Sequence, residues 1–193
     1  MVNADQVRVG TPDQLTTGAI LSAPTGTTLP TSASDELDDG FADSGYVSAD
    51  GLTLAPDMST ADINEWGGAL VRRLLETFDG TLSWSHLETN ENSLKNTFGD
   101  ANVTVTPADS THGKQIKVAI GASLPEVKSW AFKIKDGAER ILIVVPRGQV
   151  TTVDEISFVS NDAIMWPVTL STYPDSEGHC IYIYTDDGQV VKA

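Results

Sequence analysis

The feature that most constrains the fold is a series of short runs rich in β-branched and aromatic residues in the second half of the chain. Each run is bounded by Gly, Pro, Asp or Asn, the residues typical of turns. The runs are Val103 to Val105, Gln115 to Ile120, Trp130 to Lys135, Ile141 to Val145, Gln149 to Phe158, Ile164 to Tyr173 and His179 to Thr185. This pattern predicts an all-β meander.

The turn between two of these runs is well defined by its residues. Lys135, Asp136, Gly137 and Ala138 separate Trp130 to Ile134 from Ile141 to Val145, and an Asp-Gly pair between two apolar runs is a strong hairpin signal. We expect a mainly β fold: a β-sandwich or flattened barrel of antiparallel strands, with one short α-helix on the outside.

The middle of the chain is less uniform. Leu52 and Leu54 alternate with small or polar residues until Pro56, which predicts a strand, and residues 57–68 then read as a loop. Residues 69–78 place apolar side chains at helical spacing, whereas residues 81–87 alternate with a period of two. Asp79 and Gly80 would form a hairpin turn if both segments are strands.

A short helix follows this ambiguous stretch. Leu94 and Phe98 lie on one face over residues 92–98, Asn90 or Asn92 can cap the start, and Gly99 can end it.

The N-terminal region differs in composition from the rest. From Gly10 to Ala49 the sequence is rich in Gly, Pro, Thr, Ser and Asp, with a short apolar island at residues 19–21. This composition predicts an extended arm that becomes ordered at an interface. We expect one domain over residues 1–193, with the arm at residues 1–44 and the β core at residues 45–193.

The charge is unevenly distributed along the chain. The formal net charge is −15, and residues 9–71 contain ten acidic residues and no Lys or Arg. Binding to a phosphate backbone depends on Lys and Arg, so direct nucleic-acid binding is disfavoured. No apolar run approaches the roughly 20 residues needed to cross a bilayer, and the single cysteine excludes an intrachain disulfide.

Motifs for catalysis or metal binding are missing from the sequence. His86, His112 and His179 lack ligand spacing, and no nucleophile elbow, phosphate loop or dinucleotide fingerprint occurs. A carboxylate pair such as Asp57 and Glu65 is uninformative in so acidic a chain. The acidic run at residues 35–40 departs from the calcium-loop pattern. We therefore predict neither an enzyme nor a cofactor or metal site.

The four tryptophans fall into two groups. Trp84, Trp130 and Trp166 lie in predicted strands and are expected in the core. Trp66 lies among acidic and small residues, where it either contacts another subunit or caps the end of the sandwich.

Two stretches resemble a known family. GAILSAPTGTTLPTSASDELDDGFADSGYVSADGLT, starting at Gly18, reads like the opening of tail tube subunits from long, non-contractile tails of phages of actinobacteria. Residues 45–99, with their order of strand, acidic loop, strand pair and short helix, resemble the core of a phage major tail protein. The resemblance makes residues 69–78 a strand and covers residues 18–99 most closely. Such proteins often carry a C-terminal immunoglobulin-like module, which we do not expect here.

The resemblance implies a structural role in the virion. Subunits would close into hexameric rings, stack into a tube and pass the phage DNA through the lumen without binding it specifically. Residues 46–54 and 71–87 would line the inner wall, residues 57–68 would reach the adjacent ring, and the N-terminal region would bridge subunits. Other tail proteins, namely the tape measure, terminator and distal tail proteins, would be partners, and assembly would take place in the host cytoplasm without a membrane.

Particular residues follow from this arrangement. The acidic candidates for the lumen are Asp57, Asp62, Glu65, Glu76 and Asp79, and the candidates for contacts between subunits or rings are Ile63, Trp66, Arg72 and Arg73. Repulsion of DNA would keep the passage free. Two alternatives remain at this stage: a tube subunit of a contractile tail or injection device, and a phage decoration or receptor-binding β-sandwich.

Overall fold

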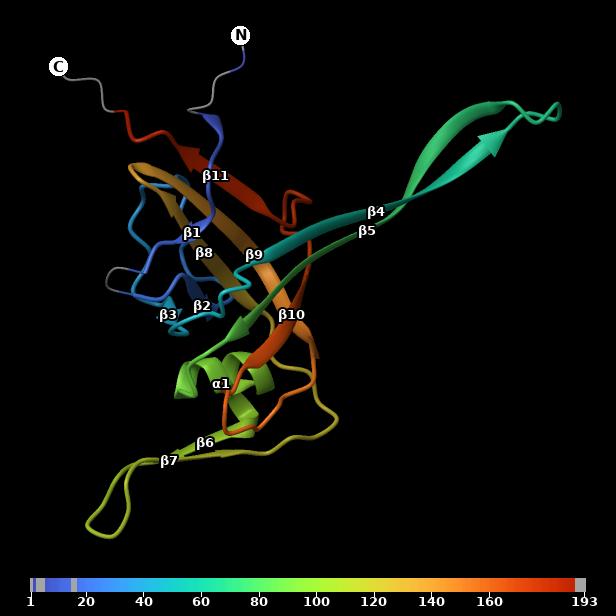
Figure 1. Ribbon diagram of the computed structural model, residues 1–193. Helices are drawn as coiled ribbons and strands as arrows, with labels where there is room; N and C mark the ends of the chain where they lie inside the picture. Colours follow the sequence, from blue (N-terminus) through green and yellow to red (C-terminus); the bar gives the residue numbers. More distant parts are fainter. Residues whose placement is uncertain (1, 3–5, 15–16, 190–193) are drawn as a thin grey trace.

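The computed structural model describes residues 2, 6–14 and 17–189 (Figure 1). Its strands and helices are β1 (Thr11–Pro12), β2 (Ile20–Pro24), β3 (Ala42–Asp43), β4 (Thr53–Asn64), β5 (Leu70–His86), α1 (Glu91–Phe98), the 3-10 turn η2 (Asp100–Asn102), β6 (Val103–Thr106), β7 (Gln115–Val118), β8 (Lys128–Asp136), β9 (Glu139–Val153), β10 (Trp166–Thr172) and β11 (Tyr182–Asp186). The mainly β fold predicted from the sequence is confirmed.

One antiparallel sheet forms the body, in the order β3-β2-β8-β9-β10-β5-β4, with β1 added to β8 and β11 added to β9. The long strand β9 serves two groups of strands, because residues 140–144 pair with β11 and residues 148–153 pair with β10. The sheet is therefore divided into two leaves that share β9, and it does not close into a barrel. The sequence predicted residues 141–145 and 149–158 as separate strands, whereas β9 continues from the first into the second and ends at Val153, so that residues 154–158 lie outside it.

The main core lies between the two leaves. Ile20, Trp130, Phe132, Ile143 and Val145 come from one leaf, and Leu82, Trp84, Val150, Val168 and Leu170 come from the other. Trp84 contacts Trp130 and Phe132 edge to face, with ring centroids 5.4 and 5.3 Å apart. Gly148 allows Leu170 to pack closely against β9, since a Cβ at this position would lie 2.9 Å from Leu170 Cδ2. Two of the three tryptophans expected in the core thus bring the leaves together.

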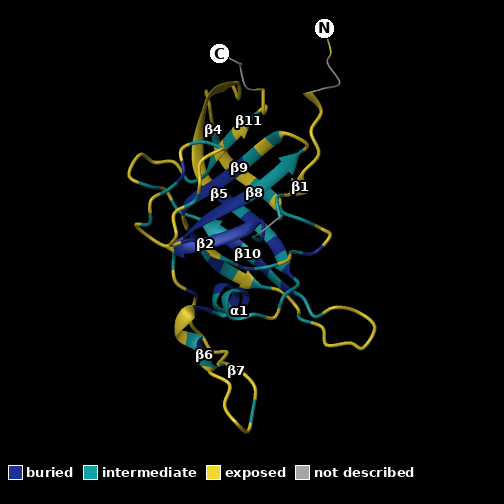
Figure 2. Ribbon diagram, turned by 90° about the vertical axis from the view of Figure 1, so that its left-hand side faces the viewer, coloured by how far each residue is buried: buried dark blue, intermediate teal, exposed yellow. Residues whose placement is uncertain are grey.

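The N-terminal region is more closely attached to the body than its composition indicates. Strand β2 is almost wholly buried and pairs with β8 (Figure 2). The segment after it packs Leu29, Leu37 and Phe41 over the outer face of β8 and β9. The sequence predicted an extended arm here. The segment between β2 and β3 is irregular, as expected of an arm, but the prediction is wrong for β2, because the apolar residues 19–21 form part of a buried strand.

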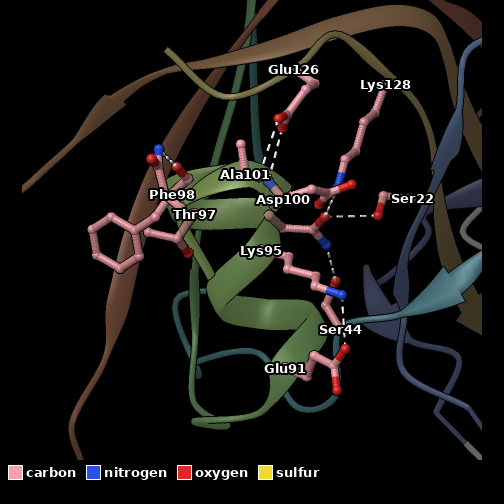
Figure 3. A network of polar contacts seen from close by, with 12 residues as sticks. Ser22, Ser44, Glu91, Lys95, Thr97, Phe98, Asp100, Ala101, Glu126 and Lys128 are labelled. Carbon is pink, nitrogen blue, oxygen red and sulfur yellow. Dashed lines mark hydrogen bonds and ion pairs between the residues drawn. The ribbon is translucent and has the colours of Figure 1, made fainter. Parts of the chain in front are cut away.

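Helix α1 closes one end of the body as predicted. Asn90 caps its start and Gly99 follows its last residue. Its Asn96 is buried and joins two other segments: Asn96 Nδ2 donates to Ser44 Oγ at 2.8 Å, and Ser22 Oγ donates to Asn96 Oδ1 at 2.8 Å (Figure 3). A buried polar network of this kind fixes the helix to β2. The predicted turn at residues 135–138 also forms, between β8 and β9.

Candidate assembly surface

The hairpin of β4 and β5 projects far beyond the body (Figure 1). The two strands pair antiparallel from Thr53↔Ser83 outward to Asn64↔Leu70. The predicted loop at residues 57–68 is therefore wrong over residues 57–64, which belong to β4. The predicted turn at Asp79 and Gly80 is also wrong, because Asp79 pairs with Asp57 in the middle of the ladder.

The true turn lies at residues 65–69. Glu65 N–H donates to Ala69 O at 2.9 Å, and Gly68 N–H donates to Glu65 O at 2.8 Å. Gly68 has a φ of 90°, a left-handed conformation that favours glycine. The Gly67-Gly68 pair is the sequence signal for this turn. The Asp79-Gly80 pair, which has the composition of a hairpin turn, wrongly predicted the turn at the middle of the ladder.

Both outer edges of the projecting hairpin lack a partner strand among the described residues. Strand β5 pairs with β10 only over residues 81–86, which leaves its outer edge free over residues 70–80. Strand β4 ends the sheet order and pairs only with β5. Free edges present rows of N–H and C=O groups that can pair with another strand, and an isolated two-stranded ribbon is only marginally stable.

The hairpin also exposes many large apolar side chains. They are Met58, Ile63, Trp66, Leu70, Val71, Leu74, Leu75 and Phe78. Trp66 is fully exposed, with a relative accessibility of 105%. Contiguous apolar surface of this kind marks interaction sites on soluble proteins. Of these residues, the sequence singled out only Ile63 and Trp66.

The predicted acidic and basic residues lie on this hairpin in distinct settings. Asp57 and Asp79 oppose each other across the ladder, and like charges in that position repel. Arg73 donates to Asp62 in a two-pronged pair, at 2.7 Å from Nε and 3.1 Å from Nη2. The hydrogen bond with Asp62 raises the pKa of Arg73.

The remaining candidates lie around irregularities of the ribbon. Arg72 is directly opposite Ile63, and Glu65 belongs to the turn. Glu76 is the extra residue at a register shift, since Ser59 pairs with Thr77 while Thr60 pairs with Leu75. The hairpin therefore brings all nine predicted residues onto one structure.

The base of the hairpin contains a buried titratable group. His86 is fully buried at the end of β5, where Trp84 Nε1 donates to His86 Nε2 at 3.0 Å. Burial lowers the pKa of His86 to about 4. His86 Nδ1 and Ser48 Oγ have no hydrogen-bond partner among the described residues. Alternation with Trp84, which was expected in the core, is the sequence signal that places His86 on the same face.

The other groups do not assemble into a reactive site. His112 contacts Asp109 and His179 lies near Glu177, both on the surface. Within residues 2, 6–14 and 17–189, His, Cys, Asp and Glu form no cluster suited to a metal ion. No helix in that part of the chain has the length and apolarity to span a bilayer.

The chain was compared with protein families and with solved structures. A family model described as "Phage tail tube protein" matches residues 2–193. One similar solved structure is the anti-feeding prophage tube-terminating cap, with 15% identity, 93% of this chain and 94% of that chain covered, and a TM-score of 0.47. Another is the PVC sheath/tube terminator of an extracellular contractile injection system, with 14% identity, 91% and 98% covered, and a TM-score of 0.42.

The family assignment depends on the family model, because the two structural likenesses are weak. The search of curated proteins found no match. The family model spans nearly the whole chain, including the hairpin of β4 and β5. The chain therefore belongs to the phage tail tube protein family.

Proposed function

We propose that this protein is the major tail tube subunit of a long, non-contractile phage tail. The observation that carries the proposal is the hairpin of β4 and β5, which leaves the body with two free edges and an exposed apolar surface. A structural role follows, with no catalytic step and no cofactor. The protein would lie in the virion tail after assembly in the host cytoplasm.

The two free edges of the hairpin are suited to ring formation. Strand β4 runs outward and β5 runs back, so the β5 edge of one copy can pair antiparallel with the β4 edge of the next. Each copy uses a different edge toward each neighbour, and a head-to-tail contact of this kind forms a ring when successive rotations return to the first copy. Six copies per ring and stacking of the rings into a tube are the arrangement that the family resemblance implies.

The charges suit a passage for DNA. The hairpin and its turn contain the acidic lumen candidates Asp57, Asp62, Glu65, Glu76 and Asp79. Repulsion between this wall and the phosphate backbone would allow DNA to pass without binding.

Contacts between subunits and between rings would use the outer part of the hairpin. Trp66 and Ile63 offer apolar anchors, and Arg72 offers a charge that can pair with an acid of a neighbouring copy. Arg73 would have to share its guanidinium between Asp62 of its own chain and such an acid. The ends of the tube would meet the tape measure, terminator and distal tail proteins.

The experiment is negative-stain electron microscopy of the purified full chain over a concentration series, with sedimentation analysis of the same samples. We expect hollow tubes or stacked rings whose fraction rises with concentration. A particle that keeps one small size at every concentration would contradict the proposal and favour a decoration or receptor-binding module.

A further inference from the structure

The exposed apolar residues of the hairpin are not distributed evenly over its two faces. Directly opposed residues in an antiparallel ladder project to the same face, and successive residues alternate. Met58 and Phe78 are opposed, as are Asp57 and Asp79. Near the body the ribbon therefore has an apolar face and an acidic face.

The apolar face continues the core of the body. Leu54 and Leu82 are opposed in the same ladder, and both pack in the main core. Alternation places Gly80 and then Phe78 on that side, and a Cβ at Gly80 would lie 3.0 Å from Phe78 Cε1 and 3.2 Å from Ile181 Cδ1. Phe78 thus lies next to the last covered position, with 42% of its surface exposed.

The acidic face carries no large apolar side chain over the same length, because its members there are Ala55, Asp57 and Ser59 opposite Thr81, Asp79 and Thr77. Beside Asp57 and Asp79, the hydroxyls of Ser59 and Thr77 lie 2.6 Å apart and hydrogen-bond across the strands. Covering two opposed carboxylates with protein would remove their hydration without supplying a counter-charge. We therefore expect this face to remain exposed to water.

Beyond the register shift at Glu76 the ribbon carries large apolar side chains on both faces, beside the Asp62–Arg73 ion pair and Arg72. Leu75 and Leu70 fall on the face of Met58, whereas Leu74 and Ile63 fall on the other. The fully exposed Trp66 follows in the turn. Both faces of the outer part of the hairpin can therefore contact protein. In the inner part, one face can contact protein while the other faces water.

We propose that the apolar face of Met58, Leu70, Leu75 and Phe78 packs against the body of a second copy of this chain, while Asp57 and Asp79 face water. The second copy is favoured because the free edges of β4 and β5 are antiparallel and of similar length, so each fits the other on a neighbouring copy. Within one copy, the body covers the core face of the hairpin only as far as Gly80. The body of the next copy would cover the same face beyond that residue.

This inference depends on the proposed function and deepens it. It divides the predicted acidic residues: Asp57 and Asp79 line the open side, whereas Asp62 shares the face of Met58 and is neutralised there by Arg73.

The test introduces the same charge at adjacent residues on opposite faces. Phe78→Asp places a carboxylate on the apolar face, and Thr77→Asp is the matched control on the acidic face. Met58→Asp repeats the test on β4. Circular dichroism and sedimentation of the dilute proteins check that each monomer folds, and electron microscopy with a sedimentation series measures assembly.

We expect Phe78→Asp and Met58→Asp to raise the concentration needed for assembly by at least roughly tenfold, equivalent to about 1.4 kcal/mol. Thr77→Asp should assemble close to the wild-type concentration. The proposal is overturned if Phe78→Asp assembles normally or if Thr77→Asp is impaired to the same degree. A wild-type chain that forms no rings or tubes would instead contradict the proposed function itself.

Discussion

The two halves of β5 show how one strand can serve folding at one end and assembly at the other. Over residues 80–86 every second side chain is buried, and Leu82 is 0% exposed. Over residues 70–79 all side chains are exposed, and Leu75 is 61% exposed. Both halves carry large apolar residues, so the difference comes from the opposite leaf, whose Trp130 and Phe132 cover the inner half alone.

The comparison indicates that apolar content alone does not identify the core of a chain that assembles. The inner half contributes to the unfolding free energy of one copy, whereas the apolar residues of the outer half become buried only when another copy covers them. A substitution should therefore affect unfolding in the inner half and association in the outer half.

The largest effect on unfolding is expected at Leu82. Leu82→Ala removes buried methyl groups from the main core and should lower the unfolding free energy by about 2–5 kcal/mol. Leu75→Ala, the same change on the same face of the outer half, should alter the unfolding free energy by less than about 0.5 kcal/mol. Urea unfolding of the dilute proteins measures both, and equal losses would contradict the division of the strand.

A smaller effect is expected from pH, through His86. In the unfolded chain this imidazole binds its proton near pH 6.5, whereas the buried side chain does so only near pH 4. The unfolded state binds more protons between these values, so the unfolding free energy should fall by about 3 kcal/mol as the pH is lowered from 6.5 to below 4.

His86→Gln is the matched variant for this effect, since glutamine can accept the hydrogen bond from Trp84 Nε1 but does not titrate. The variant should lose less stability than the wild type between pH 6.5 and 4. Carboxylates with a lowered pKa, such as Asp35 and Asp109, lose their contribution only below about pH 4. Parallel pH profiles of the two proteins would rule out His86 as the cause.

The same division explains what the sequence could and could not predict. The strands after α1 were predicted because turn residues bound them and apolar side chains recur in them, whereas β2 was missed because its apolar run is short. Candidate cap residues, with Gly99 at the end, located the helix. The outer half of β5 was ambiguous because Leu70, Val71, Leu74, Leu75 and Phe78 recur at the spacings of three and four that are typical of a helix face. The register shifts next to Val71 and Glu76 interrupt the period of two that would have indicated a strand.

The nine candidate residues lie on one hairpin, but their arrangement on it was not predicted. Asp57, Asp79, Arg72 and Trp66 do lie on the hairpin. The sequence could not assign their faces, because a single extra residue exchanges the two faces of a strand. Met58 was missed because nothing near it in the sequence indicates that it opposes Phe78.

An effect confined to assembly is expected at Trp66. Trp66→Ala removes a fully exposed indole, so the unfolding free energy should stay within about 0.5 kcal/mol of the wild type. Tube or ring formation should decline, because large aromatic side chains contribute strongly to protein contacts. Electron microscopy at matched concentrations measures this, and unchanged assembly would remove the turn from the interface.

The smallest effect is expected from the charges of β4 on the stability of the hairpin. Its sign should differ between Asp57, which opposes another carboxylate, and Asp62, which pairs with Arg73 on the other face. Asp57→Asn removes repulsion from the opposed Asp79 and should slow amide hydrogen exchange in the hairpin of the monomer. Asp62→Asn removes the attraction of Arg73 and should speed exchange. Both changes should fade in 1 M salt, where the screening length is about 3 Å. Changes of the same sign, or changes that persist in salt, would show that hydrogen bonding at these positions outweighs charge.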